Sequence, residues 1–194
     1  MERTSVQRLA RVLRVMVIVI FVCNVVALLV VHLLALAAPE LRDILAGGSL
    51  PVSTVPEDDI VRIPLPVLLV ASWLLVWTEP QTAILTGFLL ACGICTAVIL
   101  WQGKRVLDTI LAGEPFSMKN AANLRRAAVC CFVISGAALV RLIWGLVYYA
   151  SFRPLLTYNA LFVPVFLVGG LLFLVMSALF RQAAELKAEN DLTI

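Results

Sequence analysis

Residues 15–38 read VMVIVIFVCNVVALLVVHLLALAA, a stretch that contains no Asp, Glu, Lys or Arg. A helix needs about 20 predominantly apolar residues to cross the hydrocarbon core of a bilayer, and this stretch is longer than that. The whole chain has the same character, since 62% of its residues are hydrophobic and only 14% are charged. The sequence therefore predicts an integral membrane protein.

Three further apolar stretches follow along the chain. They lie at about residues 80–103, 127–150 and 161–180, and Arg141 is the one formal charge inside them. The polar segments between the apolar stretches are too short to form independent domains. We therefore expect one all-α membrane domain over residues 1–194, built as a four-transmembrane-helix bundle.

The distribution of Lys and Arg predicts the orientation of the bundle, because positively charged flanks stay on the cytoplasmic side. Segments 1–14 and 104–126 are rich in Lys and Arg, whereas segment 39–79 is mainly acidic. We expect both termini, segment 104–126 and the tail 181–194 in the cytoplasm. Segment 39–79 is then an extracytoplasmic insertion of an inner-membrane protein.

A shorter uncharged segment lies inside this insertion at residues 63–78. It is below the length of about 17 residues for a span, and as a fifth helix it would place the basic segment 104–126 outside. We expect an interfacial or re-entrant segment, with Trp73 and Trp77 at the headgroup level. A short strand at 59–63 is also compatible with the sequence.

The start of the chain has features of both a membrane span and a signal sequence. Ala35, Leu36 and Ala37 form the small-x-small pattern of a signal-peptidase site. However, the apolar stretch at 15–38 is longer than the about 7 to 15 residues of a signal core. We expect the first span to be retained.

All five cysteines lie inside the predicted spans: Cys23, Cys92, Cys95, Cys130 and Cys131. Cys92 and Cys95 form a C-x-x-C pattern, which in a soluble protein would suggest redox or metal chemistry. Apolar surroundings disfavour the reactive thiolate, and small side chains pack well between helices. We therefore expect packing residues, and neither a metal nor a cofactor.

The fourth span contains a proline and a pair of glycines. We expect Pro164 in the first turn of its helix, where the missing N–H costs little. Gly169 and Gly170 lie deeper, where they could bend the helix or admit a neighbouring helix.

The basic segment 104–126, which we call the elbow, has clear helix stop and start signals. Apolar residues at helical spacing predict that the second span continues into an amphipathic helix. Gly113 is placed to end that helix as a C-terminal cap, and Pro115 cannot continue it. Ser117 is a suitable N-cap for the next helix. The elbow should therefore reverse the chain between two helices.

Two segments of the chain resemble a known family. They are Gly113-Glu114-Pro115-Phe116-Ser117, followed by Asn120-Ala121 and Leu124-Arg125, and the ending LKAENDLTI at 186–194. Together they resemble the bacterial membrane-protein family catalogued as domain of unknown function 2975, which includes the YoaS-like proteins. The resemblance implies four spans in this order, a bacterial inner membrane, and no established enzymatic activity. The long insertion 39–79 departs from shorter members, so we place it outside the resemblance.

The resemblance also suggests a partner, because members are often encoded beside a small Cro/CI-type helix-turn-helix regulator. Our leading hypothesis is a regulatory or sensor-type anchor that docks such a soluble cytoplasmic protein. The candidate docking residues are Phe116, Asn120, Arg125, Glu189 and Asp191. The lipid bilayer is the other expected partner, a homo-oligomer is an open option, and we expect no direct binding of nucleic acid.

Placing a polar or charged side chain inside the membrane costs free energy, so such residues are candidates for a functional role. Arg141 is one, although its long side chain could also snorkel to the membrane surface. Asn24 and His32, in the first span, could join it in a polar network. The alternative hypothesis is therefore a small transporter or channel subunit, and a structural subunit of another complex is a third.

The chain has no Walker loop, no H-E-x-x-H and no metal-ligand cluster, so we expect no enzyme.

Overall fold

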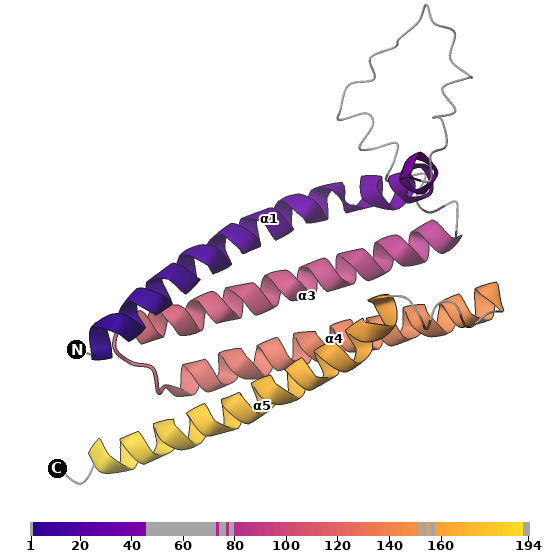
Figure 1. Cartoon of the computed structure of the whole chain (residues 1–194). Helices are drawn as coiled ribbons and strands as arrows, with labels where there is room; N and C mark the ends of the chain where they lie inside the picture. Colours follow the sequence, from indigo (N-terminus) through magenta and orange to yellow (C-terminus); the bar gives the residue numbers. More distant parts are fainter. Residues whose placement is uncertain are drawn as a thin grey trace, which may run out of the picture. The chain divides into compact units, whose positions relative to one another are not determined.

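A computed structural model describes residues 2–45, 73, 77, 80–150, 152, 155 and 158–191. These residues form four helices, α1 (Glu2–Leu45), α3 (Pro80–Leu111), α4 (Met118–Tyr149) and α5 (Tyr158–Asp191), and they contain no strand (Figure 1). The predicted all-α fold is thereby confirmed. The strand considered at 59–63 lies outside the described residues, as does segment 63–78 apart from Trp73 and Trp77.

Each helix contains a stretch long and apolar enough to cross a membrane. The four stretches are Gln7–Val30, Thr82–Leu111, Met118–Tyr148 and Ala160–Asn190. Helices α3 and α4 have 32 residues each, which corresponds to a length of about 48 Å, against about 30 Å for the hydrocarbon core. The four predicted spans are therefore confirmed as helices, and α3 and α4 are longer than a crossing requires.

Two helices extend past the ends of the predicted spans. Helix α1 continues through Pro39 to Leu45, and α5 continues beyond residue 180 to Asp191. The predicted boundaries followed the ends of the apolar runs, which indicate where the bilayer ends. A helix can continue into water when the next residues are good helix formers, as in the AAELKAE sequence of the tail.

The position of Pro164 differs from the prediction. Because α5 begins at Tyr158, Pro164 lies inside the helix and not in its first turn. Proline has no N–H, so the carbonyl of Ala160, four residues earlier, lacks its usual donor. Next to the proline, the Ser135 hydroxyl of α4 donates a hydrogen bond of 2.9 Å to the carbonyl of Val163. This bond connects α4 to α5 at the point where the internal ladder of α5 is interrupted.

The chain divides into two compact units, residues 1–26 with 91–194, and residues 27–90. The first unit holds the N-terminal part of α1, most of α3, and all of α4 and α5. In the second unit, Thr86 is fully buried and Trp73 and Trp77 are both exposed, with ring centroids 6.1 Å apart.

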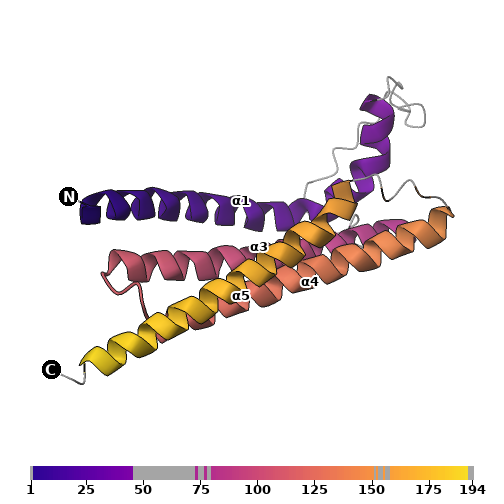
Figure 2. The same cartoon turned by 60° about the horizontal axis from the view of Figure 1, so that its bottom comes forward.

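Helices α4 and α5 lie side by side in both views (Figures 1 and 2). The fully or almost fully buried positions of α4 are mostly small: Ala121, Ala127, Ala128, Cys131, Ser135 and Ala138. Small side chains allow two helix backbones to approach closely. On α5 the buried position is Gly170, beside the ring of Phe132. These small residues therefore allow a close contact between α4 and α5, and the first unit also buries Ala10 of α1 and Leu107 of α3.

Within this first unit, the N-terminal end of α1, the turn between α3 and α4, and the C-terminal end of α5 lie at the same end (Figure 2). These are three of the segments that we expect in the cytoplasm. The arrangement is compatible with that expectation, while the side of the membrane stays a prediction.

Candidate functional site

The elbow begins with a well-formed helix stop. Gly113 has a φ of +84°, which glycine adopts readily. Its N–H donates to the carbonyl of Ile110 at 3.2 Å, and the N–H of Glu114 donates to the carbonyl of Thr109 at 3.0 Å. These two bonds form a Schellman motif, which satisfies carbonyls at the end of α3. Gly113 is thus the C-terminal cap that the sequence predicted.

The next helix begins where the sequence predicted it. Ser117 has extended backbone angles, φ −133° and ψ 147°, and its hydroxyl oxygen accepts from the backbone N–H of Asn120 at 3.4 Å. The same N–H donates to the carbonyl of Ser117 at 3.0 Å. Ser117 is therefore the N-cap of α4, and the two caps together reverse the chain within a few residues.

Asn120 holds the two sides of the reversal together. Its side chain is fully buried, and its amide Nδ2 donates to the carbonyl of Pro115 at 2.7 Å and to Oγ1 of Thr109 at 2.6 Å. The Thr109 hydroxyl in turn donates to the carbonyl of Val106 at 2.7 Å. Both amide hydrogens are thus used inside the elbow. We proposed Asn120 as a docking residue, but it has no exposed surface to offer, so we remove it from the docking set.

The elbow also contacts α5. The Ser177 hydroxyl donates a hydrogen bond of 2.7 Å to the carbonyl of Ala121. One turn further along α5, the ring of Phe180 lies 5.8 Å from the ring of Phe116, centroid to centroid. Phe116 is 50% exposed. The elbow and the last turns of α5 therefore form one continuous surface, which we call the elbow–tail surface.

The elbow–tail surface has a mixed charge. Its exposed charged residues are Arg105, Glu114, Lys119, Arg125, Arg126, Arg181, Glu185, Lys187 and Glu189. Arg181 and Glu185 form an ion pair of 2.8 Å along α5, which at this exposure contributes little stability. The candidate residues Arg125 and Glu189 are thus accessible to a partner. Asp191 is the last residue of α5, and its side chain lies outside the described residues.

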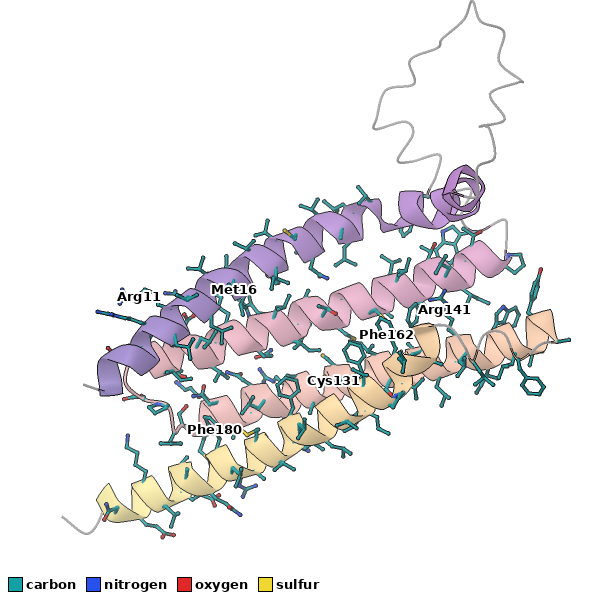
Figure 3. All side chains as sticks on the ribbon, in the orientation of Figure 1. Arg11, Met16, Cys131, Arg141, Phe162 and Phe180 are labelled. Atoms are coloured by element: carbon teal, nitrogen blue, oxygen red, sulfur yellow. The ribbon has the colours of Figure 1, made fainter. Side chains whose placement is uncertain are left out.

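The structure places the three candidate polar residues of the spans as follows. Asn24 is partly buried on α1, and its Oδ1 is buried without a hydrogen-bond partner among the described residues. Arg141 is partly buried on α4; Figure 3 labels it, with Phe162 of α5. His32 lies within α1, but its side chain is outside the described residues. Among the described side chains, the carbonyl oxygen of Asn24 therefore has no hydrogen bond to Arg141, and the polar network stays a prediction.

An ion-pair cluster between α1 and α3 was not predicted from the sequence. Nε of Arg14 lies 2.8 Å from Oδ1 of Asp108, and Nζ of Lys104 lies 3.1 Å from Oδ2. The Arg14 N–H is not aligned for a hydrogen bond, so charge holds this contact. From the sequence, Arg14 is expected to orient the chain or to lie near anionic headgroups, and not to pair with an acidic residue. The sequence contains one indication of this cluster, because Asp108 is the one acidic residue between Lys104 and Gly113.

Among the described residues, no group of three or more His, Cys, Asp or Glu side chains could hold a metal ion. The polar features of this part of the chain include caps, the Asn120 bonds and ion pairs, and these stabilise the structure.

Comparison with known proteins gives one match. No curated protein and no solved structure matches the chain. A family model described as "Protein of unknown function (DUF2975)" matches residues 47–194. The match includes most of the insertion, residues 47–79, which we had placed outside the resemblance, and it leaves out the first span. It contains both the elbow and the C-terminal ending. The family model matches about three quarters of the chain, and the chain therefore belongs to the DUF2975 family of proteins of unknown function.

Proposed function

We propose that the protein is a regulatory or sensor-type membrane anchor that docks a soluble protein on its elbow–tail surface. The main support for this proposal is the contact between Phe116 and Phe180, because it joins two distant parts of the sequence into one accessible surface. The Ser177 bond to Ala121 fixes the two helices at the same place. The surface is thus held in shape before any partner arrives.

The composition of the elbow–tail surface suits a protein interface. Phe116 is large, apolar and 50% exposed, and the elbow and the last turns of α5 carry exposed charged residues of both signs. Interfaces commonly have an aromatic anchor at the centre and a polar rim that remains accessible to water. Arg125 and Glu189 belong to such a rim. The partner that the family resemblance suggests is a small helix-turn-helix regulator, which the anchor would hold at the cytoplasmic face.

Co-purification from bacterial membranes tests the proposal. The chain offers a matched control, because Phe152 is also exposed, at 82%, in the connection between α4 and α5. We expect a soluble partner to be recovered with the unaltered protein and with Phe152→Ser, and to be lost with Phe116→Ser. A protein counts as a partner only if its recovery shows this difference and its purified form binds the purified anchor. Equal binding to both variants would exclude docking at the elbow.

A small transporter or channel is the alternative. Its support comes from a buried polar atom that lacks a hydrogen-bond partner in the described part of the chain, Oδ1 of Asn24. Polar groups at membrane depth often mark a solute path. Flux into vesicles that contain the purified protein would support this alternative if Arg141→Leu abolished it and Phe116→Ser did not.

A further inference from the structure

A groove lies between α1 and α3 in the first unit. Its volume is about 240 Å³, and its lining residues are Val17, Ile18, Phe21, Leu100, Trp101 and Lys104. The rings of Phe21 and Trp101 are 5.8 Å apart, centroid to centroid. Lys104 is the only lining residue that carries a charge. The lining of the groove is apolar throughout, and the ammonium group of Lys104 lies at its edge beside Trp101, which we call the cationic end.

Positive charge exceeds negative charge at this end of the groove. Nζ of Lys104 lies 5.3 Å from the centroid of the Trp101 ring, and the guanidinium carbon of Arg105 lies 5.8 Å from it. Asp108 bridges Lys104 and Arg14. Arg14 and Lys104 therefore share one carboxylate, and Arg105 adds a third positive charge, which leaves a net positive charge beside the Trp101 ring.

The cationic end is placed where lipid headgroups are expected. Arg14 immediately precedes the apolar stretch 15–38, and Lys104 immediately follows the stretch 80–103. Tryptophan is enriched at the same level of membrane proteins, and Trp101 is 43% exposed. The floor residues Val17, Phe21 and Leu100 lie within the apolar stretches, at the depth of acyl chains.

We propose that this groove binds an anionic phospholipid. The phosphate would lie against Lys104 and Arg105, and an acyl chain would lie along Val17, Phe21 and Leu100. Basic pockets between membrane helices bind anionic headgroups by this combination of charge and apolar contact. A zwitterionic lipid offers the same chains with no net charge, and a soluble phosphate offers the charge without the chains. Only the anionic lipid satisfies both parts of the groove.

The chain contains a matched control for surface charge. Arg11 lies one turn before Arg14 on α1, and Figure 3 shows its side chain directed away from the other helices. Arg11→Gln removes one positive charge near the membrane surface but leaves the groove unchanged. A specific site should therefore respond to loss of Lys104 or Arg105 and not to loss of Arg11.

The test uses the purified full-length protein in a neutral detergent. Binding of phosphatidylglycerol and of phosphatidylcholine with identical chains is measured by native mass spectrometry, with the shift of the unfolding temperature as a second readout. We expect tighter binding and a larger shift with phosphatidylglycerol. Each of Lys104→Gln and Arg105→Gln should weaken phosphatidylglycerol binding about fivefold. Arg11→Gln should change the binding less than twofold.

A further variant, Val17→Trp, fills the floor of the groove and keeps every charge. We expect it to weaken phosphatidylglycerol binding as well, and unfolding in phosphatidylcholine shows whether each variant is folded. Equal binding of the two lipids would overturn the proposal, as would an equal effect of Arg11→Gln. Stabilisation by soluble glycerol phosphate to the same extent would show an anion site and would also overturn it.

Discussion

Gly170 of α5 lies directly against the ring of Phe132 on α4. A Cβ atom at position 170 would be 2.8 Å from Cε1 of that ring. The contacts on either side follow a regular spacing, since Ser177 bonds to Ala121 and Ser135 bonds to Val163. On α5 the contact residues Val163, Gly170 and Ser177 are thus seven positions apart, with Gly170 midway. A seven-residue repeat is typical of left-handed helix packing, and here it connects the membrane interior to the elbow.

We therefore expect the stability of the protein to depend on the glycine at position 170 but not on the glycine at position 169. We expect Gly170→Ala to destabilise the protein by about 1 to 3 kcal/mol, because the Phe132 ring must move to admit the methyl group. At Gly169 an added Cβ meets nothing within 4 Å. Gly169→Ala should stabilise the helix by up to about 1 kcal/mol. Unfolding in detergent measures both, and equal effects would contradict the close contact.

A second prediction concerns the bonds of Asn120. Replacing Asn120 by Leu leaves the Pro115 carbonyl without its donor and removes the bond to Thr109. We expect a loss of about 1 to 3 kcal/mol, the usual cost of leaving a buried polar group unpaired. Lys119→Leu, at the exposed neighbouring position, is the control and should change stability by less than about 0.5 kcal/mol.

A double-mutant cycle distinguishes this bond from general packing. Thr109→Val should cost less in the Asn120→Leu background than in the unaltered protein, because the shared bond is already absent. Additive effects would show that the Asn120 bond to Thr109 does not stabilise the elbow.

Features that depend on a few neighbouring residues, or on the composition of one segment, could be predicted from the sequence. Gly113 and Ser117 were predicted as caps because a cap is defined by a few neighbouring residues, and the structure confirms both. The spans were predicted because the bilayer imposes a length and an apolar composition. The resemblance to the family rested on the elbow and the ending, and the family match includes both.

Features that depend on which helices meet could not be predicted. Asn120 was expected to face a partner, because nothing in the sequence shows that Thr109 and the Pro115 carbonyl lie beside it. Pro164 was placed in a first turn, because the apolar run begins later than the helix does. The Arg14 contact with Asp108 joins residues far apart in the chain, so only the packed helices reveal it.

A third prediction concerns the side of the membrane. Reporter fusions after Gly113 and at Ile194 should indicate the cytoplasm, and fusions after Gly48 and Arg153 should indicate the outside. The reason is the excess of Lys and Arg in segments 1–14 and 104–126. A fusion after Gly113 that reports the outside would contradict the predicted orientation and would favour a fifth span at residues 63–78.

The last prediction concerns the ion pair between α1 and α3. Arg14→Glu replaces the positive charge that lies 2.8 Å from Asp108 by a like charge, and we expect it to lower the stability at low salt. The side chains of Arg14 and Asp108 are 42% and 34% exposed, so solvent screens the pair and the loss should be at most about 1 kcal/mol. The exchange Arg14→Glu with Asp108→Arg recreates an opposite pair but removes the Lys104 contact, so it should restore only part of this stability. Combining Arg11→Glu with Asp108→Arg makes the same net charge change but should not restore stability.

The difference in stability between the two double variants should shrink in 1 M salt, where the screening length is about 3 Å. If both double variants unfold alike at low salt, Arg14 and Asp108 do not form the contact that joins the two helices.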